Sequence, residues 1–553
     1  MATGLWPTSD SGEIGRERNN MQETTKTDCL SFGDSLFLYL ERPGMPLHVA
    51  ALCIFDGDIP VAKCMRSIWS KLSLVPRYRQ KVVQPPFGLG GLRWEYDSTF
   101  DIRDHVHDIQ LKRGTPSELQ QVVSRILSTT LCRNRPLWDF TLISGLKDRK
   151  TALLARVHHC LADGISGVEL LSMLLDKKPV IRIPRTKLPS IKFSVPRDSA
   201  SQVLEGVGAT WFSALERLLI AESQLIKIGQ GIVAETVKQP DDGPSRGQNG
   251  NELALLTQGW RSWLAEFGSP PDRLPFNKIC NGPQTFAWTE LPFRELRVLK
   301  HEARASVNDV VLALVALTMH RYARAHRIAT AARVLRIVVP VSVRTKSPAS
   351  GYGNQLTFVP VTIPLGINNP RALLPAIHNR MAIVKKIRLA EIVGLAGTLL
   401  GAIPASFQAF AGPIVSQLPL SVCNLICTNV PGPQEPLYLL GHRMLTFYPY
   451  VPIGGEMGMN CAVLTYDGTA YFGFTGDVNA ISDLNVLPGF LQESFGDLRK
   501  AFAVGETYTK GTRIKGVGVA TKKKPVIASP SVTVTTVTDA HMREKPMALK
   551  LGA

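Results

Sequence analysis

Two adjacent histidines, His158 and His159, are the side chains of this sequence best suited to proton-transfer chemistry. They end the apolar run 151–159, and the turn of the segment HHCLADG follows them. Successive strand residues point to opposite faces, so the two imidazoles should point apart. His159 shares its face with Leu153, Ala155 and Val157, whereas His158 follows Ala152, Leu154 and Arg156. We predict that His159 faces an apolar channel and acts as a general base, because neutral imidazole accepts protons near physiological pH.

Other interpretations of the histidine pair stay open on these residues alone. Two histidines at the end of a strand are often polar packing. A zinc site would need a third protein ligand, and the sequence holds neither HExxH nor a Cys/His cluster, so we expect no metal. Cys160 follows His159 directly, and because consecutive strand residues diverge, the two should not form a nucleophile and base pair.

A turn from strand to helix should hold the histidines. Asp163 and Gly164 close this turn, and we expect Asp163 to anchor the loop through a cation. The next helix is predicted to begin at Ser166, whose spacing to Glu169 is that of a capping box.

The elements before this turn predict an α/β domain over residues 28–185, preceded by a disordered leader at 1–27. The patterns predict helices at 31–42, with Ser31 as cap, at 61–74 and at 118–131, and strands at 47–58, 139–146 and 151–159. The last two strands are separated only by charged residues and should be adjacent. Proline and basic residues after Asp176 indicate where the domain ends.

The second half repeats the alternation of strands and helices. A connection at 186–275, with a helical stretch at 201–237, leads to a second α/β domain at 276–505 and a basic flexible tail at 506–553. Within the second domain we predict a helix at 307–326, strands at 334–343 and 356–365, and a hairpin at Asp467–Gly468.

Composition narrows the choice of partner only partly. The 553 residues include 63 Lys and Arg against 45 Asp and Glu, and the net charge of +18 favours any anionic partner. Nine scattered cysteines without a CxxC pair fit reduced thiols in a cytosol.

Several motifs beyond the histidines recur together in one known family. The segment HHCLADG matches the HHxxxDG motif of CoA-dependent acyltransferases. The surrounding motifs are LSFGDSLFLYLERPGMPLHVAALCIFDG, the triplet Pro136-Leu137-Trp138, SVNDVVLALVALTMHRY, VPVSVR and NVPGP. In this order, over roughly residues 30–502, the chain resembles the bacterial-type wax ester synthase/diacylglycerol acyltransferase family.

The resemblance implies a fold and an activity. It implies two chloramphenicol-acetyltransferase-like α/β domains with mixed sheets and a channel at their interface, which admits acyl-CoA from one side and an alcohol from the other. It also implies that His159 is the base, that His158 and Asp163 shape the motif with Gly164, and that the acceptor is a long-chain alcohol or diacylglycerol. Acyl-CoA is then a substrate, and no cofactor or nucleic acid is expected.

Further motif residues receive supporting roles from the resemblance. Pro136, Leu137 and Trp138 would line or support the acceptor side, with core packing as the alternative. Asn308 and Asp309 would lie across the channel, or would simply cap the helix that follows them. Residues 429–433 should form a loop after a strand at 420–428.

The association of the protein with lipid needs its own argument. No charged residue occurs over 392–434, but prolines, among them Pro404, Pro413, Pro419 and Pro431, and several glycines interrupt this stretch, so it does not predict a membrane span. We expect a cytoplasmic enzyme that binds membranes or lipid bodies peripherally. Two alternatives are a condensation-type enzyme acting on carrier-bound thioesters and a non-catalytic protein that binds lipid surfaces.

Overall fold

The computed structural model describes most of the two expected domains. The described residues are 29–84, 91–162, 164–179, 271–342, 356–386, 403, 405–415 and 423–504. The predicted leader, the helical stretch at 201–237, the basic tail and Asp163 lie outside the described residues.

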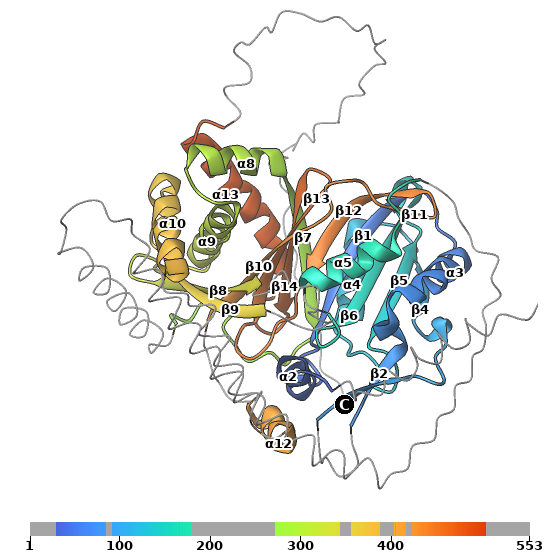
Figure 1. The fold of residues 1–553 in the computed structure, drawn as a ribbon. Helices are drawn as coiled ribbons and strands as arrows, with labels where there is room; N and C mark the ends of the chain where they lie inside the picture. The colour runs from blue at the N-terminus through green and yellow to red at the C-terminus, as the bar shows by residue number, and fades with distance from the viewer. Residues whose placement is uncertain are drawn as a thin grey trace, which may run out of the picture. The chain divides into compact units, whose positions relative to one another are not determined.

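Two six-stranded mixed sheets form the framework (Figure 1). The first has the order β11-β12-β1-β6-β5-β4, and the second has the order β7-β14-β13-β10-β8-β9. The strands of the first sheet are β1 His48–Asp56, β4 Val106–Gln110, β5 Trp138–Ser144, β6 Lys150–His158, β11 Tyr438–Leu439 and β12 His442–Tyr450. Those of the second are β7 Gln284–Pro292, β8 Val334–Ser342, β9 Leu356–Pro364, β10 Leu425–Pro431, β13 Met459–Tyr466 and β14 Thr469–Asp477. The expected α/β class with mixed sheets is confirmed.

Helices flank both sheets. The helices of the first half are α2 Phe32–Leu40, α3 Val61–Lys71, α4 Pro116–Leu127 and α5 Gly164–Leu174. Those of the second half are α8 Phe293–Glu302, α9 Val307–Ala325, α10 Pro370–Lys386, α12 Ala405–Val415 and α13 Leu487–Ala501. Helices α9, α10 and α13 lie along one side of the second sheet (Figure 1).

The first sheet takes two strands from the second half of the chain. Strand β12 pairs antiparallel with β1, so that Ala50 lies opposite Tyr450. Strand β1 pairs on its other side with β6, which ends at His158 directly before His159, and Ala51 lies opposite Ala155. The strand that ends at Tyr450 is therefore only one strand removed from the strand that ends at His158.

Local signals placed most elements of the first half. Ser31 caps α2, and its side chain accepts a hydrogen bond from the Asp34 N–H at 3.1 Å, as expected. Strands β5 and β6 are adjacent and antiparallel, which is also as expected. The prediction for α4 was wrong at both ends. Thr115 caps the helix, Pro116 starts it, and the helix ends at Leu127 rather than at residue 131. A proline suits the first helical turn because its missing N–H is not needed there.

In the second half, one predicted strand lies further along the chain than expected. Helix α9, strands β8 and β9 and the hairpin at Asp467–Gly468, where both residues have positive φ, are confirmed. The strand predicted at 420–428 lies instead at Leu425–Pro431, so the first residues of the expected loop at 429–433 are strand. Parallel pairing with β13, which places Cys427 opposite Cys461 and Pro431 opposite Thr465, extends the strand to this point.

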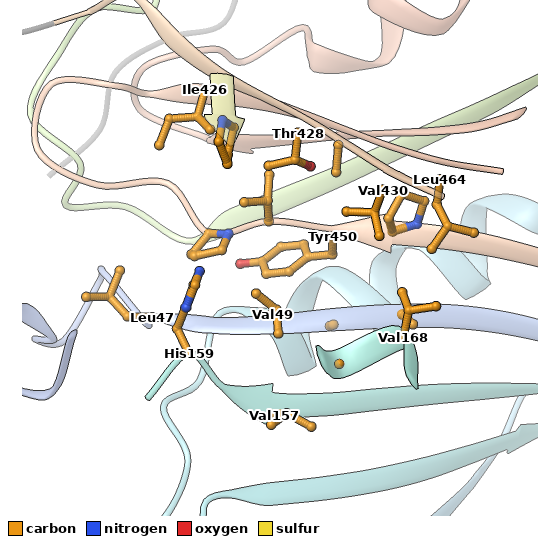
Figure 2. Close-up of a pocket in the computed structure, with 18 of the residues that line it drawn as sticks. Leu47, Val49, Val157, His159, Val168, Ile426, Thr428, Val430, Tyr450 and Leu464 are labelled. Atoms are coloured by element: carbon orange, nitrogen blue, oxygen red, sulfur yellow. The ribbon is translucent and has the colours of Figure 1, made fainter. Parts of the chain in front are cut away.

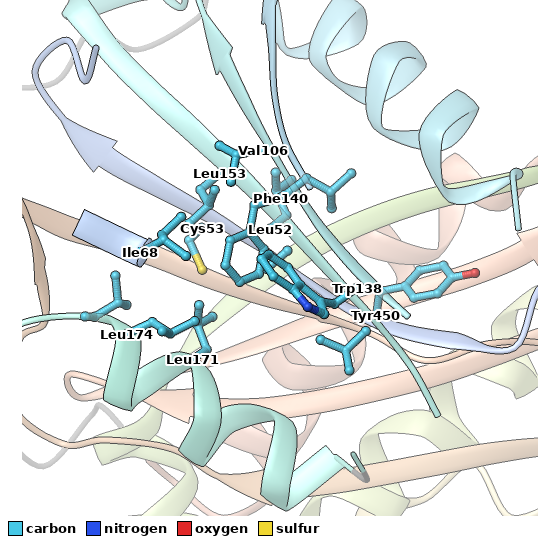
Figure 3. Packing of buried hydrophobic residues seen from close by; sticks show 14 of the residues in the cluster. Leu52, Cys53, Ile68, Val106, Trp138, Phe140, Leu153, Leu171, Leu174 and Tyr450 are labelled. Atoms are coloured by element: carbon cyan, nitrogen blue, oxygen red, sulfur yellow. The ribbon is translucent and has the colours of Figure 1, made fainter. Parts of the chain in front are cut away.

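Each sheet has its own buried apolar cluster. Trp138 is fully buried in the first, against Tyr78 and Phe140. Figure 3 shows Trp138 and Phe140 beside Leu52 and Leu153. The second cluster surrounds α9, whose apolar residues are almost all buried. The Ser128 hydroxyl, after α4, donates to the Gln284 carbonyl of β7 and accepts from the Gln284 N–H, and these two hydrogen bonds join the two parts.

Candidate active site

An apolar cavity of about 460 Å³ lies where residues of the two sheets meet. This volume is within the range of about 300–1,000 Å³ that is usual for ligand sites. Its lining includes Phe37, Met45, Val49, Ala51, Tyr78, Ala155, Val157, His159, Val168, Leu171, Phe358, Ile426, Thr428, Asn429, Val430, Tyr450 and Leu464. Apart from a few polar groups, the lining is aliphatic or aromatic, so the cavity suits a hydrocarbon chain.

His159 directs its imidazole into this cavity, as Figure 2 shows. Strand β6 ends at His158, yet Ala155, Val157 and His159 all line the cavity, so the predicted alternation of faces is confirmed. The His159 N–H donates to the Leu47 carbonyl at 3.0 Å. The ring stacks on Phe37 of α2, with centroids 3.9 Å apart and an interplanar angle of 9°. The backbone of His159 is thus held by Leu47 and its ring by Phe37.

His158 lies on the other face of β6 and is fully buried. Its Nδ1 accepts a hydrogen bond from the Cys160 N–H at 3.2 Å, and its Nε2 lies 3.4 Å from the Glu41 carboxylate. Burial raises the pKa of the Cys160 thiol well above its usual range, so this cysteine is no thiolate nucleophile. The expectation that His159 and Cys160 form no dyad agrees with this environment.

Pro136, Leu137 and Trp138 are buried at the start of β5. None of them lines the cavity, and Leu137 and Trp138 are buried in the core of the first sheet. The Leu137 carbonyl accepts from the His158 N–H at 2.9 Å, while the Trp138 indole donates to the Tyr78 carbonyl at 2.8 Å. The alternative of core packing therefore holds, with a direct hydrogen bond to the end of β6.

Asn308 and Asp309 also lie away from the cavity lining. Asp309 forms a reciprocal capping box with Ser306 at the start of α9, and its carboxylate lies 2.9 Å from His378 Nδ1. Asn308 occupies the same first turn. Asp309 thus takes part in capping the helix, as the alternative expected, with Ser306 as the cap residue.

Helix α5 begins earlier than predicted. Its first residue is Gly164, so Ser166 lies inside the helix and is not its cap. The Ser–x–x–Glu pattern was misread, because the same spacing also occurs within helices. Val168 and Leu171 of α5 line the cavity, so the helix that follows the histidines closes one of its walls.

Sequence patterns gave no indication of several cavity residues. Phe37 comes from α2, Thr428 and Val430 come from β10, and Tyr450 ends β12. The Tyr450 hydroxyl donates to the Gln284 side chain, and burial raises the pKa of the phenol, so it stays protonated. The alternation in β10 could have predicted that Ile426, Thr428 and Val430 share a face, but not which face meets the cavity.

The next question is whether side chains of the described residues could bind a metal ion. Over the described residues, no group of three His, Cys, Asp or Glu side chains is arranged to hold a metal ion. Asp163 lies outside the described residues, so the expectation of a metal-free site stays a prediction.

The fold and the histidine motif together define an acyltransferase of the two-sheet, HHxxxDG type. The catalytic-domain model of wax ester synthase/diacylglycerol acyltransferase matches residues 30–311, and the C-terminal-domain model of the same family matches residues 352–499. The chain belongs to the wax ester synthase/diacylglycerol acyltransferase family.

Relatives and solved structures agree with this assignment. The chain is 25% identical to the probable diacylglycerol O-acyltransferase tgs1 of Mycobacterium tuberculosis, over 82% of this chain and 91% of that protein. For tgs2 of the same organism the identity is 27%, over 86% of this chain and 100% of that protein. The wax ester synthase/diacylglycerol acyltransferase structure from Marinobacter aquaeolei has a TM-score of 0.57 at 22% identity, covering 86% of this chain and all of that one.

Condensation domains share the fold more distantly. The first condensation domain of the calcium-dependent antibiotic synthetase superposes with a TM-score of 0.52 at 16% identity, covering 87% of this chain and 97% of that one. At this identity the likeness concerns the fold alone. It agrees with the expected architecture of two domains like that of chloramphenicol acetyltransferase.

Proposed function

We propose that the protein transfers a fatty acyl group from acyl-CoA to the hydroxyl of a long-chain alcohol or diacylglycerol, giving wax ester or triacylglycerol. His159 is the general base, and acyl-CoA is a substrate, so no cofactor takes part. The observation that carries this proposal is the imidazole of the HHxxxDG motif projecting into an apolar cavity in a chain of this family.

For this reaction the protein has to position the two substrates and to supply one group that accepts and returns a proton. Neutral His159 takes the hydroxyl proton while the alcohol oxygen attacks the thioester carbonyl carbon. The tetrahedral intermediate collapses, the C–S bond breaks, and the imidazolium returns the proton to the CoA sulfur. The aliphatic lining keeps water from the carbonyl, which would otherwise be hydrolysed.

In the direct test, labelled palmitoyl-CoA and either hexadecanol or diacylglycerol are incubated with the purified protein, and the lipid products are separated. We expect labelled wax ester, labelled triacylglycerol or both, released with one CoA per ester. Absence of both esters, with the protein folded, would support the alternative of a non-catalytic lipid-binding protein. Amide formation on a carrier-bound thioester alone would support the condensation-type alternative.

Peripheral attachment to membranes or lipid bodies is the second part of the proposal. No helix among the described residues is long and apolar enough to cross a membrane. Helix α12 nevertheless exposes Phe407, Phe410 and Ile414, whose side chains are 59%, 72% and 51% exposed. Spacings of three and four residues place these side chains on one helix face. Such a face can enter the outer part of a lipid layer while the net charge of +18 attracts anionic headgroups.

We expect the protein to float with vesicles of phosphatidylcholine and phosphatidylserine and to be released as salt rises, because charge attraction is screened over about 8 Å at physiological ionic strength. Each Lys or Arg near an anionic surface contributes about 1 kcal/mol, so deletion of 506–553 should weaken binding. Phe410→Ser should weaken it further. Leu74→Ser, which changes a side chain that is 59% exposed outside α12, is the matched control. Equal flotation of both variants would argue against α12 as the contact.

A further inference from the structure

Glu41, the residue after α2, carries a buried carboxylate that contacts three separate segments. Its side chain is 3% exposed. Oε1 accepts the Leu47 N–H at 3.1 Å, and Oε2 accepts from Arg133 Nη2 at 3.0 Å. Oε1 also lies 3.4 Å from His158 Nε2. Burying a carboxylate is strongly unfavourable unless partners compensate it, so this cluster has been assembled around the charge.

The hydrogen bond that His158 Nδ1 accepts determines which of its nitrogens carries the proton. Its Nδ1 accepts from the backbone N–H of Cys160, so Nδ1 has no hydrogen. The neutral ring then carries its hydrogen on Nε2, the nitrogen that faces Glu41. The Cys160 N–H thus fixes the tautomer, and the charge of Glu41, 3.4 Å from Nε2, favours the ring orientation that turns this nitrogen toward it.

Leu47 links the same carboxylate to the backbone of His159. Its N–H donates to Glu41, and its carbonyl accepts from the His159 N–H at 3.0 Å. Phe37, in the last turn of α2 before Glu41, stacks on the His159 ring. The end of α2 thus restrains the backbone of His159 through Leu47 and its ring through Phe37.

We propose that Glu41 is a positioning residue for His159 in the acyl transfer. Glu41 does not line the cavity, so it acts without contacting substrate. It holds the Leu47 backbone by a hydrogen bond and places its charge 3.4 Å from His158 Nε2, and these two contacts restrain the end of β6 from which His159 enters the cavity. The inference rests on the function proposed above, because positioning affects a rate only if His159 takes part in the reaction.

Charge adds a second effect of Glu41. Burial alone would raise the pKa of the Glu41 carboxyl, but His158, the Leu47 N–H and Arg133 outweigh it and lower this pKa to about 2. Glu41 is therefore ionised at every pH at which the enzyme would be assayed. The other titratable or charged groups of this neighbourhood are His48, Cys160, Asp34, Arg133 and Arg156. His48 lies opposite His158, and burial, with Arg156 nearby, lowers its pKa.

The test is Glu41→Gln, measured by kcat, KM and the pH profile of kcat/KM. We expect kcat to fall roughly 10- to 100-fold while KM for acyl-CoA changes little, since misplacement of a catalytic group by about 1 Å can cost 100-fold. The acid limb should move to lower pH, because a nearby carboxylate favours the charged imidazolium and the amide does not. Glu118→Gln is the matched control, because Glu118 also holds backbone N–H groups but lies on α4, outside the cavity.

A second variant separates charge from position. Glu41→Asp keeps the charge but shortens the reach, so kcat should fall while the acid limb stays near that of the parent. A Glu41→Gln protein with unchanged kcat and pH profile would overturn the proposal, as would a loss explained entirely by a smaller folded fraction. If these results appear while His159→Ala is inactive, only the role of Glu41 fails. An active His159→Ala protein would remove the proposed base and this inference with it.

Discussion

Replacement of His159 by alanine is expected to lower kcat for acyl transfer by about 100- to 10,000-fold, the range typical of general-base assistance. The other ionisable groups that line the cavity cannot take over this role. Burial raises the pKa of both Tyr78 and Tyr450, so their phenols stay protonated. The fold should persist, because the ring already borders a cavity, so its removal enlarges an existing space. The measurement is turnover of labelled palmitoyl-CoA with hexadecanol, alongside thermal unfolding.

His158→Ala is the control for this result, and it should behave differently. His158 does not line the cavity, but its removal takes a partner from the Cys160 N–H and from the buried Glu41 carboxylate. Leaving a buried polar group without a partner costs about 1–3 kcal/mol, so a lower unfolding temperature and a partial loss of activity are expected. Complete loss of activity in both variants with normal folding would argue against the assignment of faces in β6.

The pattern of residues along the chain predicted the site where the interactions are local. The period of two in β6 predicted which histidine faces the cavity, because strand geometry alone decides this. Ser31 and the Asp467–Gly468 hairpin were found for the same reason. The start of α5 was missed because a capping pattern at Ser166 cannot be told, from sequence, from the same spacing inside a helix.

Long-range pairing is where the sequence could not predict the site. Strand β12 enters the first sheet beside β1 from nearly 400 residues further along the chain, and this brings Tyr450 to the cavity. The contact of Glu41 with His158 depends on where α2 ends relative to β6. Neither leaves a periodic signal. The shift of β10 was missed likewise, since pairing with β13, rather than local turn chemistry, decides where this strand ends.

Ala51 and Ala155 leave the space in the cavity that a hydrocarbon chain needs. They lie directly opposite each other on β1 and β6, and both line the cavity. Residues opposite each other in a sheet share a face, so a larger side chain at Ala51 must project into the same space. Ala51→Leu should therefore shorten the chain that the cavity accepts while leaving His159 in place.

We expect Ala51→Leu to lower kcat/KM for palmitoyl-CoA relative to octanoyl-CoA by about 10- to 200-fold, since one methylene in an apolar pocket is worth about 1–3 kcal/mol. A parallel series of alcohols from octanol to hexadecanol shows which substrate lies there: the series whose length dependence shifts is the one that occupies the cavity. Ala62→Leu makes the same change at an exposed position of α3 and should leave both series unaltered. If neither series shifts in folded Ala51→Leu, the cavity beside His159 holds neither chain during the reaction, and the acyl path must run elsewhere.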